Sequence, residues 1–427
     1  MHPSLARPRP RFSERMPASI PRKRGMRHMI DIEPEKLKRI RAEMARDNID
    51  VLVCRLAENV VFLSGFFCVL GYAAVVFPRE GDPVLIASSR EEEWYGRGWV
   101  SDVRTFPMWD ARDTTTPQAT HFSSSEHINR LLKQIGDERK FPAKRVGYEG
   151  SFEFIAPPVI VPEPVVPGEP SMRGLRAAFP HAELVDATGA LNRARAFKTA
   201  RDVKMLRRTH EVTAMGLEAW KAACLNLSTE AEAAAAFQSA VTAKGIGHDG
   251  AMFAMGWPQV FSGPYTEQWV YRPSSTRRIR KGDFVIIELA VCVDGYYSDL
   301  TRTLVVGEPN DRQVHLFDTT HRALKEGLAL AKPGVAAADI DRHCKATLGE
   351  YSKYLLHHSG HGLGWKYHEP IPTLTGSSSD VLAEGMYFAI EPAAYVPGLG
   401  GVRNEHNAVV TKTGVEVLSN IFPVSIN

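Results

Sequence analysis

In the C-terminal half of the chain, acidic residues end apolar runs that have the composition of β-strands. One run leads from a turn at Lys281 to Glu288, Asp294-Gly295 then gives a hairpin signal, and the next run carries Asp299. Adjacent antiparallel strands bring two such carboxylates side by side. Buried acids without partners cost free energy, so this pattern predicts a cation between the strands.

Three further signals extend the acidic pair. His361 has a glycine on each side, and His368 follows it seven residues later. Glu391 and Glu405 each end another apolar run. Four carboxylates and one imidazole, all predicted at strand ends, form an oxygen-rich ligand set. Such a set suits a pair of divalent ions such as Mn²⁺, Co²⁺, Zn²⁺ or Fe²⁺.

Length and composition narrow the class of protein. A chain of 427 residues exceeds what one hydrophobic core usually organises, so two domains are expected. The 52 basic and 49 acidic side chains are balanced, which argues against a nucleic-acid partner. Five scattered cysteines without a CxxC pair predict reduced core thiols in a cytoplasmic protein. The apolar runs are shorter than the roughly 18 to 20 residues of a membrane span.

The N-terminal half alternates predicted helices and strands, which indicates an α/β domain over residues 28–190. Residues 1–27 are rich in Arg and Pro and are predicted to be a disordered tail or the product of a mis-called start, with Met26 as an alternative start. The predicted strands are 51–54, 60–63, 73–77, 83–87, 146–148 and 183–185, and the predicted helices begin near residues 35, 127 and 172. A helix pair near residues 198 and 229 opens the second domain, 191–427.

The C-terminal segments together resemble the pita-bread hydrolase family, which includes creatinase, aminopeptidase P and prolidase. The resemblance rests on Gly-Tyr-x-Ser-Asp-x-Thr-Arg-Thr, Gly-His-Gly-x-Gly, His-Glu-x-Pro, Gly-Met-x-Phe-x-x-Glu-Pro and Gly-x-Arg-x-Glu, in that order, over roughly residues 195–424. It implies an α+β fold. A creatinase-like α/β domain would precede a pseudo-symmetric pita-bread catalytic domain with a curved antiparallel sheet.

The resemblance also implies a function: hydrolysis of an amide bond next to proline, as in Xaa-Pro aminopeptidases or dipeptidases, at a dinuclear metal site. The substrate would be a small peptide or amide, and the enzyme a cytoplasmic homodimer that uses Mn, Co or Zn. Asp299 and Glu405 would bridge the two metals, Glu288 would hold one, and His361 and Glu391 the other. The expected catalytic residues are His361, His368, Glu391 and Glu288, and the expected substrate-binding residues are His368, Tyr271 and Arg403.

Three departures from the family pattern keep other hypotheses open. Glu288 stands where the family has Asp, Tyr271 stands where metal-dependent members have a substrate-binding His, and His406 replaces a common Asp. A metal-independent or non-peptide C–N amidohydrolase of the creatinase or ectoine hydrolase type would use Glu288 as base or nucleophile. A non-catalytic peptide-binding pseudoenzyme is a minor alternative. His357 and His358 are interpreted as surface or satisfied core histidines.

Overall fold

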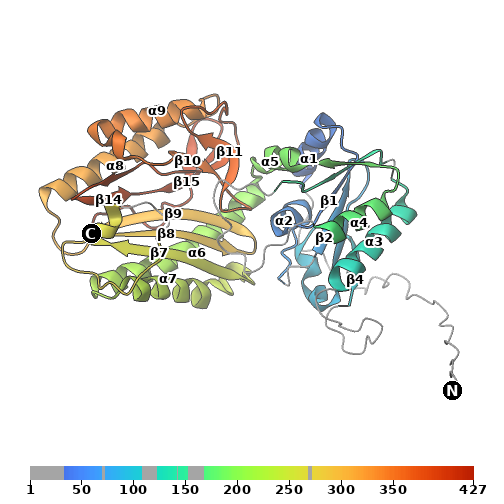
Figure 1. The fold of residues 1–427 in the computed structure, drawn as a ribbon, viewed down its shortest axis with the longest axis horizontal. Coiled ribbons are helices and arrows are strands. Elements are labelled where there is room, and N and C mark those ends of the chain that lie inside the picture. The colour runs from blue at the N-terminus through green and yellow to red at the C-terminus, as the bar shows by residue number, and fades with distance from the viewer. Residues whose placement is uncertain (1–32, 70–72, 108–122, 142, 152–167, 268–271) are drawn as a thin grey trace, which may run out of the picture.

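The chain forms two bodies of helices and strands that lie side by side in the computed structural model (Figure 1). The structure describes residues 33–427 except 70–72, 108–122, 142, 152–167 and 268–271. The predicted tail, Tyr271 and most of the proline-rich stretch near residue 160 therefore lie outside the described residues. Within the described ranges, none of the helices combines the length and the apolar character needed to cross a membrane.

The N-terminal body is built on a six-stranded mixed sheet with the strand order β4-β3-β2-β1-β5-β6. The β1–β2 and β2–β3 pairs are antiparallel, whereas β3–β4, β1–β5 and β5–β6 are parallel. Its elements are α1 (Pro34–Arg46), β1 (Val51–Cys54), α2 (Ala57–Ser64), β2 (Ala73–Pro78), β3 (Val84–Ser88), β4 (Asp102–Phe106), α3 (Ser123–Arg139), β5 (Arg145–Tyr148), α4 (Glu169–Ala178), β6 (Glu183–Asp186) and α5 (Thr188–Arg195).

The central strands of this sheet are apolar because both of their faces are covered. Side chains alternate across a strand, so Val51 and Val53 point to one face and Leu52 and Cys54 to the other. The first pair packs in a core with residues of α3 and α4, and the second in a core with residues of α1, α2 and α5. This explains the continuous apolar runs and confirms the predicted α/β pattern.

One predicted strand is wrong: residues 60–63 belong to the helix α2. An apolar run of four residues has no period that separates a buried strand from a buried helix. The helix ends at Gly65, which adopts φ 69°, a left-handed conformation that glycine accepts at low cost. At the other end, the Glu149 carboxylate accepts hydrogen bonds from the backbone N–H groups of Arg55 and Leu56 and from the Asn59 side chain, at 2.9–3.0 Å.

The C-terminal body contains a three-stranded sheet β7-β8-β9, a five-stranded sheet β11-β10-β12-β15-β16 and the pair β13-β14. Figure 1 shows α6 and α7 beneath the first sheet and α8 and α9 above the second, with the strands between these layers. Its elements are α6 (Ala200–Leu225), α7 (Glu230–Gly245), β7 (Ala254–Ser262), β8 (Phe284–Val293), β9 (Tyr296–Val305), α8 (Asp311–Leu330), α9 (Ala337–Leu348), β10 (Gly360–Gly362), β11 (Glu369–Leu374), β12 (Tyr387–Ile390), β13 (Ala393–Val396), β14 (Gly400–Arg403), β15 (His406–Val410) and β16 (Val415–Val417).

The hairpin between β8 and β9 forms as the sequence predicts. Asp294 and Gly295 both have positive φ, 47° and 86°, as a tight two-residue turn requires. Thr301 lies opposite Glu288 on the neighbouring strand, and Asp299 lies two residues before it. Residues two apart share one face of a strand, so the hairpin presents Glu288 and Asp299 on the same side.

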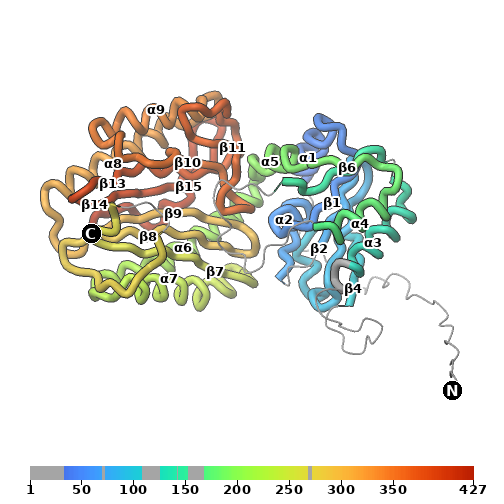
Figure 2. The backbone as a smooth tube through the Cα atoms, viewed as in Figure 1, coloured from blue at the N-terminus to red at the C-terminus, as the bar shows by residue number. Residues whose placement is uncertain are grey.

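A buried ion pair joins the start of the C-terminal body to the first residue of β11. The Lys198 ammonium group donates to the Arg195 carbonyl at 2.6 Å and lies 3.2 Å from the Glu369 carboxylate, and both side chains are almost completely buried. Lys198 also lies 4.9 Å from the centre of the Trp365 ring. The tube in Figure 2 shows this crossing region, where α5 meets β11 between the two bodies.

Removing the Glu149 carboxylate should destabilise the N-terminal body. Glu149→Ala leaves backbone N–H groups at the entrance to α2 without their acceptor, which costs about 1–3 kcal/mol. Glu183→Ala is the control, since that carboxylate is 61% exposed in its ion pair with Arg145 and should contribute at most about 1 kcal/mol. Urea unfolding of both variants measures the difference, and equal losses would contradict this account.

Breaking the Lys198–Glu369 pair should lower the free energy of unfolding by more than Glu149→Ala does. Lys198→Met removes the ammonium partner of buried Glu369, which keeps a contact of 3.7 Å with Arg195 Nε. Breaking a buried pair costs up to about 3–5 kcal/mol. Lys133→Ala removes an exposed helix pair with Asp137 and should change stability by about 0.5 kcal/mol or less. A midpoint of thermal unfolding that Lys198→Met leaves unchanged would show that the pair does not stabilise the fold.

Candidate functional site

The five predicted ligand residues converge in one buried site of the C-terminal body. Glu288, Asp299, His361, Glu391 and Glu405 are each at most 5% exposed. Their positions correct one expectation, because not all of them lie at strand ends: β8, β9 and β10 continue past their functional residues. Only the last two lie just after strands, β12 and β14. Mid-strand positions fix side-chain direction through the pairing on both sides.

The Thr301 hydroxyl group shows that the β8–β9 hairpin meets the segment after β14. Thr301 Oγ1 lies 2.5 Å from a Glu288 oxygen and 3.0 Å from a Glu405 oxygen. The first contact lies within the β8–β9 hairpin, and the second spans about a hundred residues of sequence. Glu288 and Glu405 therefore face the same interior, as the sequence predicts.

Asp299, His361 and Glu405 form a group with the geometry of a cation site. One ligand atom from each residue lies within 4.8 Å of the others. Asp299 Oδ1, Glu405 Oε1 and His361 Nε2 are buried and have no hydrogen-bond partner among the described residues. Buried polar atoms are nearly always paired, so three unpaired atoms on residues of one such group indicate a missing partner. All three carry lone pairs, and a divalent cation fits that set.

The ring orientation of His361 strengthens this interpretation. His361 Nδ1 lies 2.7 Å from the Gly362 carbonyl oxygen, which can only accept, so Nδ1 must carry the proton. The Nε2 lone pair then faces Asp299 Oδ2 at 3.1 Å. Two lone pairs at this distance repel unless a cation or proton lies between them. Burial lowers the pKa of His361 to about 4, so the ring is neutral near pH 7 and free to bind a metal.

The carboxylates of the group are also in an unfavourable environment. Burial, together with the nearby Glu405 and Glu391 charges, raises the pKa of Asp299 well above its usual range. Burial and the charge of Glu391 do the same for Glu405. A cation would relieve both the desolvation and the mutual repulsion, which is the electrostatic condition for tight binding.

Hydrogen bonds from neighbouring side chains fix these ligands in place. The Asn407 side chain accepts from the Asp299 N–H at 3.0 Å and donates to its carbonyl at 2.6 Å, which joins β15 to β9. The buried Arg302 guanidinium donates to the Glu405 carbonyl at 2.5 Å. Such outer contacts orient ligands before a metal binds.

Glu288 differs from the other carboxylates because both of its oxygens have protein donors. Tyr367 donates its hydroxyl to Oε1 at 2.6 Å, and Thr301 and Arg403 both contact Oε2. Among the described residues, Glu288 belongs to neither of the two His and acid groups whose geometry could hold an ion. The sequence did not point to Tyr367, which is 79 residues from Glu288.

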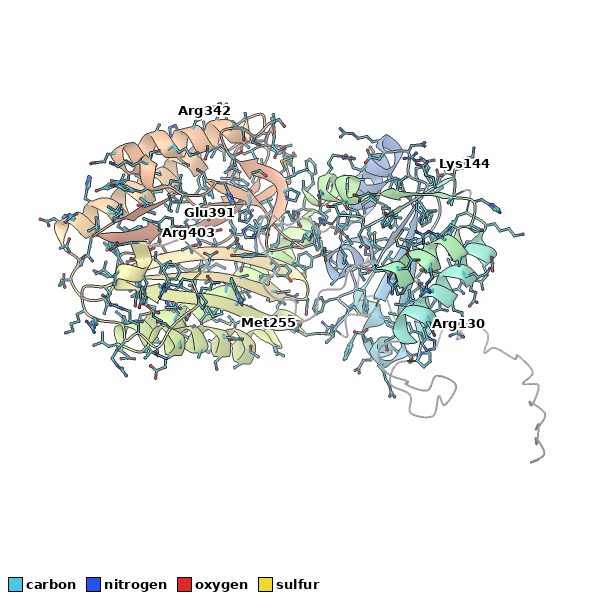
Figure 3. All side chains as sticks on the ribbon, viewed as in Figure 1. Arg130, Lys144, Met255, Arg342, Glu391 and Arg403 are labelled. Atoms are coloured by element: carbon cyan, nitrogen blue, oxygen red, sulfur yellow. The ribbon has the colours of Figure 1, made fainter. Side chains whose placement is uncertain are left out.

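Glu391 lies beside the group and is held by positively charged or protonatable partners. Its oxygens lie 3.2 Å from His358 Nε2, 3.3 Å from Arg403 Nη1 and 3.6 Å from His361 Nε2. Figure 3 shows Glu391 and Arg403 close together among the strands of the C-terminal body. Burial alone would raise the pKa of Glu391, but the His358 hydrogen bond and the His357 charge outweigh it and lower the pKa. His357 and His358 thus lie at the site, a role that sequence reasoning missed.

The predicted substrate-binding residues have different positions. His368 Nε2 lies 3.8 Å from Asp299 Oδ2, and its Nδ1 has no hydrogen-bond partner. Arg403 is 3% exposed and contacts Glu288, Glu391 and Thr301. His358, His361 and His368 form a second group that could hold an ion. It shares His361 with the first group, so one imidazole Nε2 serves only one of them at a time.

Comparison with known proteins now gives the family. Residues 204–412 match metallopeptidase family M24, and residues 36–197 match the creatinase/prolidase N-terminal domain. The chain is 26% identical over 392 residues to the Xaa-Pro dipeptidase of Pyrococcus horikoshii. This match covers 91% of this chain and 98% of that protein. It is 34% identical over 247 residues to the "Putative dipeptidase YkvY" of Bacillus subtilis, a match to 57% of this chain and 66%, just under two thirds, of that protein.

Solved structures give the same fold. The crystal structure of the prolidase from Pyrococcus horikoshii superposes with a TM-score of 0.71 over 92% of this chain and all of that chain, at 24% identity. The α+β architecture with a creatinase-type N-terminal domain is thereby confirmed. From these matches, the protein belongs to metallopeptidase family M24, the pita-bread hydrolases, and is a peptidase-type hydrolase that acts on C–N bonds.

Proposed function

We propose that the protein is a metal-dependent hydrolase that cleaves the amide bond next to proline in a dipeptide or at a peptide N terminus. The observation that carries this proposal is the buried group of Asp299, His361 and Glu405, which has closely spaced ligand atoms and, among the described residues, unpaired polar atoms. A relative that matches almost the full length bears the name Xaa-Pro dipeptidase, which supports the substrate class.

Asp299, His361 and Glu405 would hold the metal. A divalent ion held there would lower the pKa of a water molecule and polarise the scissile carbonyl. The chain contributes a preformed, dry set of donors in which the Asn407 and Arg302 hydrogen bonds reduce reorganisation. The identity of the metal and the presence of a pair of ions stay predictions.

Glu391 is the residue best placed to move a proton. Its pKa is lowered despite burial, so near pH 7 it is ionised and can accept a proton from an attacking water molecule. His358 and Arg403 hold it at two oxygens, which fixes its orientation. The same carboxyl group can then return the proton to the leaving nitrogen.

His368 is the residue best placed to contact the substrate. Burial, with the neighbouring His361 and His358, lowers its pKa well below the usual value, so it is neutral near pH 7. Its Nδ1 atom has no partner and the side chain is 8% exposed. A neutral imidazole beside Asp299 can hydrogen-bond the substrate carbonyl or the oxygen that becomes negative in the transition state. We infer that Arg403, which contacts both acids and the Thr301 hydroxyl, positions Glu288 and Glu391.

The alternatives from the sequence find less support. A metal-free mechanism needs Glu288 as base or nucleophile, but a guanidinium and two hydroxyl groups engage its oxygens, which weakens their basicity. A peptide-binding pseudoenzyme would have no reason to bury unpaired metal-binding atoms. The domain division at residues 28–190 and 191–427, the homodimer, the cytoplasmic location and the use of Mn²⁺ remain predictions.

Substrate class and metal dependence can be tested together. The protein should release proline from a panel of Xaa-Pro dipeptides when Mn²⁺ or Co²⁺ is present, lose this activity with a chelator, and regain it when metal is restored. A matched panel of cyclic and guanidino amides should stay intact. Full activity in chelator, or hydrolysis confined to the second panel, would refute the proposal.

Replacing one ligand should remove the activity without changing the fold. Loss of an outer partner of a metal lowers metal affinity or activity by about 10- to 100-fold. Asp299 would be a direct ligand, so we expect Asp299→Asn to lower kcat/KM by more than about 100-fold. Asp318→Asn, at an exposed position on α8, is the control and should keep full activity. Circular dichroism confirms folding of both variants, and an active Asp299→Asn protein would exclude this site.

A further inference from the structure

The region between Glu288 and Glu391 is filled by a protein cation. Arg403 contacts Glu288 Oε2 through Nη2, lies 3.3 Å from Glu391 Oε2 through Nη1, and donates to Thr301 Oγ1 through Nε at 2.6 Å. All three ends of the guanidinium group are therefore used on this side of the site. The side chain is 3% exposed, so this arrangement is out of contact with bulk water.

Glu288 reaches this guanidinium because its side chain has one methylene more than the aspartate expected at its position. Tyr367, directly before His368, closes the opposite side by donating to Oε1 at 2.6 Å. Burial of a carboxylate is tolerated when a charged donor and hydroxyl groups satisfy it, and here all three are present. A metal that used Glu288 would have to compete with a charged hydrogen bond inside the protein.

The remaining acids differ from Glu288 in the state of their oxygens. Among the described residues, Asp299 Oδ1, Glu405 Oε1 and His361 Nε2 have no hydrogen-bond partner, although Tyr367 also contacts Asp299 and Thr301 contacts the other Glu405 oxygen. The Arg403 and Arg302 charges act on Glu405, but within the described part of the chain neither Asp299 nor Glu405 forms an ion pair with a Lys or Arg side chain. One divalent ion would balance these two carboxylates when both are ionised. The four carboxylates thus divide into two that share Arg403 and two that share the place for an ion.

We propose that this site binds one divalent ion, on Asp299, His361 and Glu405, and that the Glu288–Arg403–Tyr367 contact takes the place of a second ion. The proposal rests on the metal dependence proposed above and narrows it. It differs from the dinuclear interpretation of the sequence, because Glu288 would be a partner of Arg403 instead of a ligand.

The stoichiometry of metal binding tests this directly. Equilibrium dialysis of the full chain against Mn²⁺, followed by elemental analysis, should give one ion per chain at saturation. Two Mn²⁺ ions held about 3.5–4 Å apart would couple magnetically and give a coupled electron paramagnetic resonance spectrum. With one ion per chain, we expect the spectrum of an isolated Mn²⁺ ion. Two ions per chain, a coupled spectrum, or no bound ion would each overturn the proposal.

Matched variants identify the ligands. Glu288→Gln should still bind one ion, whereas Glu405→Gln should bind at least about 10-fold more weakly because it removes a direct ligand. If Glu288→Gln folds poorly, Tyr367→Phe makes the same test with a smaller change and should also retain one ion. Loss of the ion in Glu288→Gln or Tyr367→Phe, with the fold intact by circular dichroism, would overturn the proposal. Proline release is measured separately: one bound ion without proline release would refute the proposed substrate, whereas proline release with two bound ions would refute only the single-ion inference.

Discussion

Burial of four carboxylates within one site is the constraint on which the rest of this structure depends. Each carboxylate loses hydration, and each raises the cost of ionising its neighbours. The protein satisfies part of this charge with its own groups, through Arg403 at Glu288 and Glu391. The part at Asp299 and Glu405 is left with unpaired oxygens. In the proposed function, an ion that balances these two carboxylates would also activate water.

The fold supplies this arrangement by bringing the strands of different sheets together. The β8–β9 hairpin carries Glu288 and Asp299 on one face, and β10, β12 and β14 deliver the other three residues from a different part of the chain. Asn407 and Arg302 lock these strands to one another at the backbone of the ligand residues. The start of the C-terminal body is tied to the same region by the Lys198–Glu369 ion pair, and Glu369 directly follows His368. The positions of the candidate site residues are therefore fixed by tertiary contacts.

The sequence was sufficient to predict the fold class, most helices and strands, and the convergence of the five candidate site residues. Motifs such as the hairpin at Asp294-Gly295 act locally, so they can be interpreted without a structure. The contacts of Glu288 could not be predicted, because Tyr367 and Arg403 are 79 and 115 residues away along the chain. The error at residues 60–63 has a similar origin: Glu149, which holds the start of α2, lies about 90 residues from it. In both cases the structure depends on contacts between residues far apart in the chain, and a single sequence does not show which of these residues are close in space.

The central claim is that the site divides its charge between an arginine and one ion. Anomalous diffraction from crystals soaked in Mn²⁺ or Co²⁺ locates each bound ion independently of activity and of solution stoichiometry. The account predicts one anomalous peak per chain, within about 2.0–2.2 Å of ligand atoms of Asp299, His361 and Glu405, with Arg403 still against Glu288. A second peak bound by Glu288, with the guanidinium displaced, would contradict it.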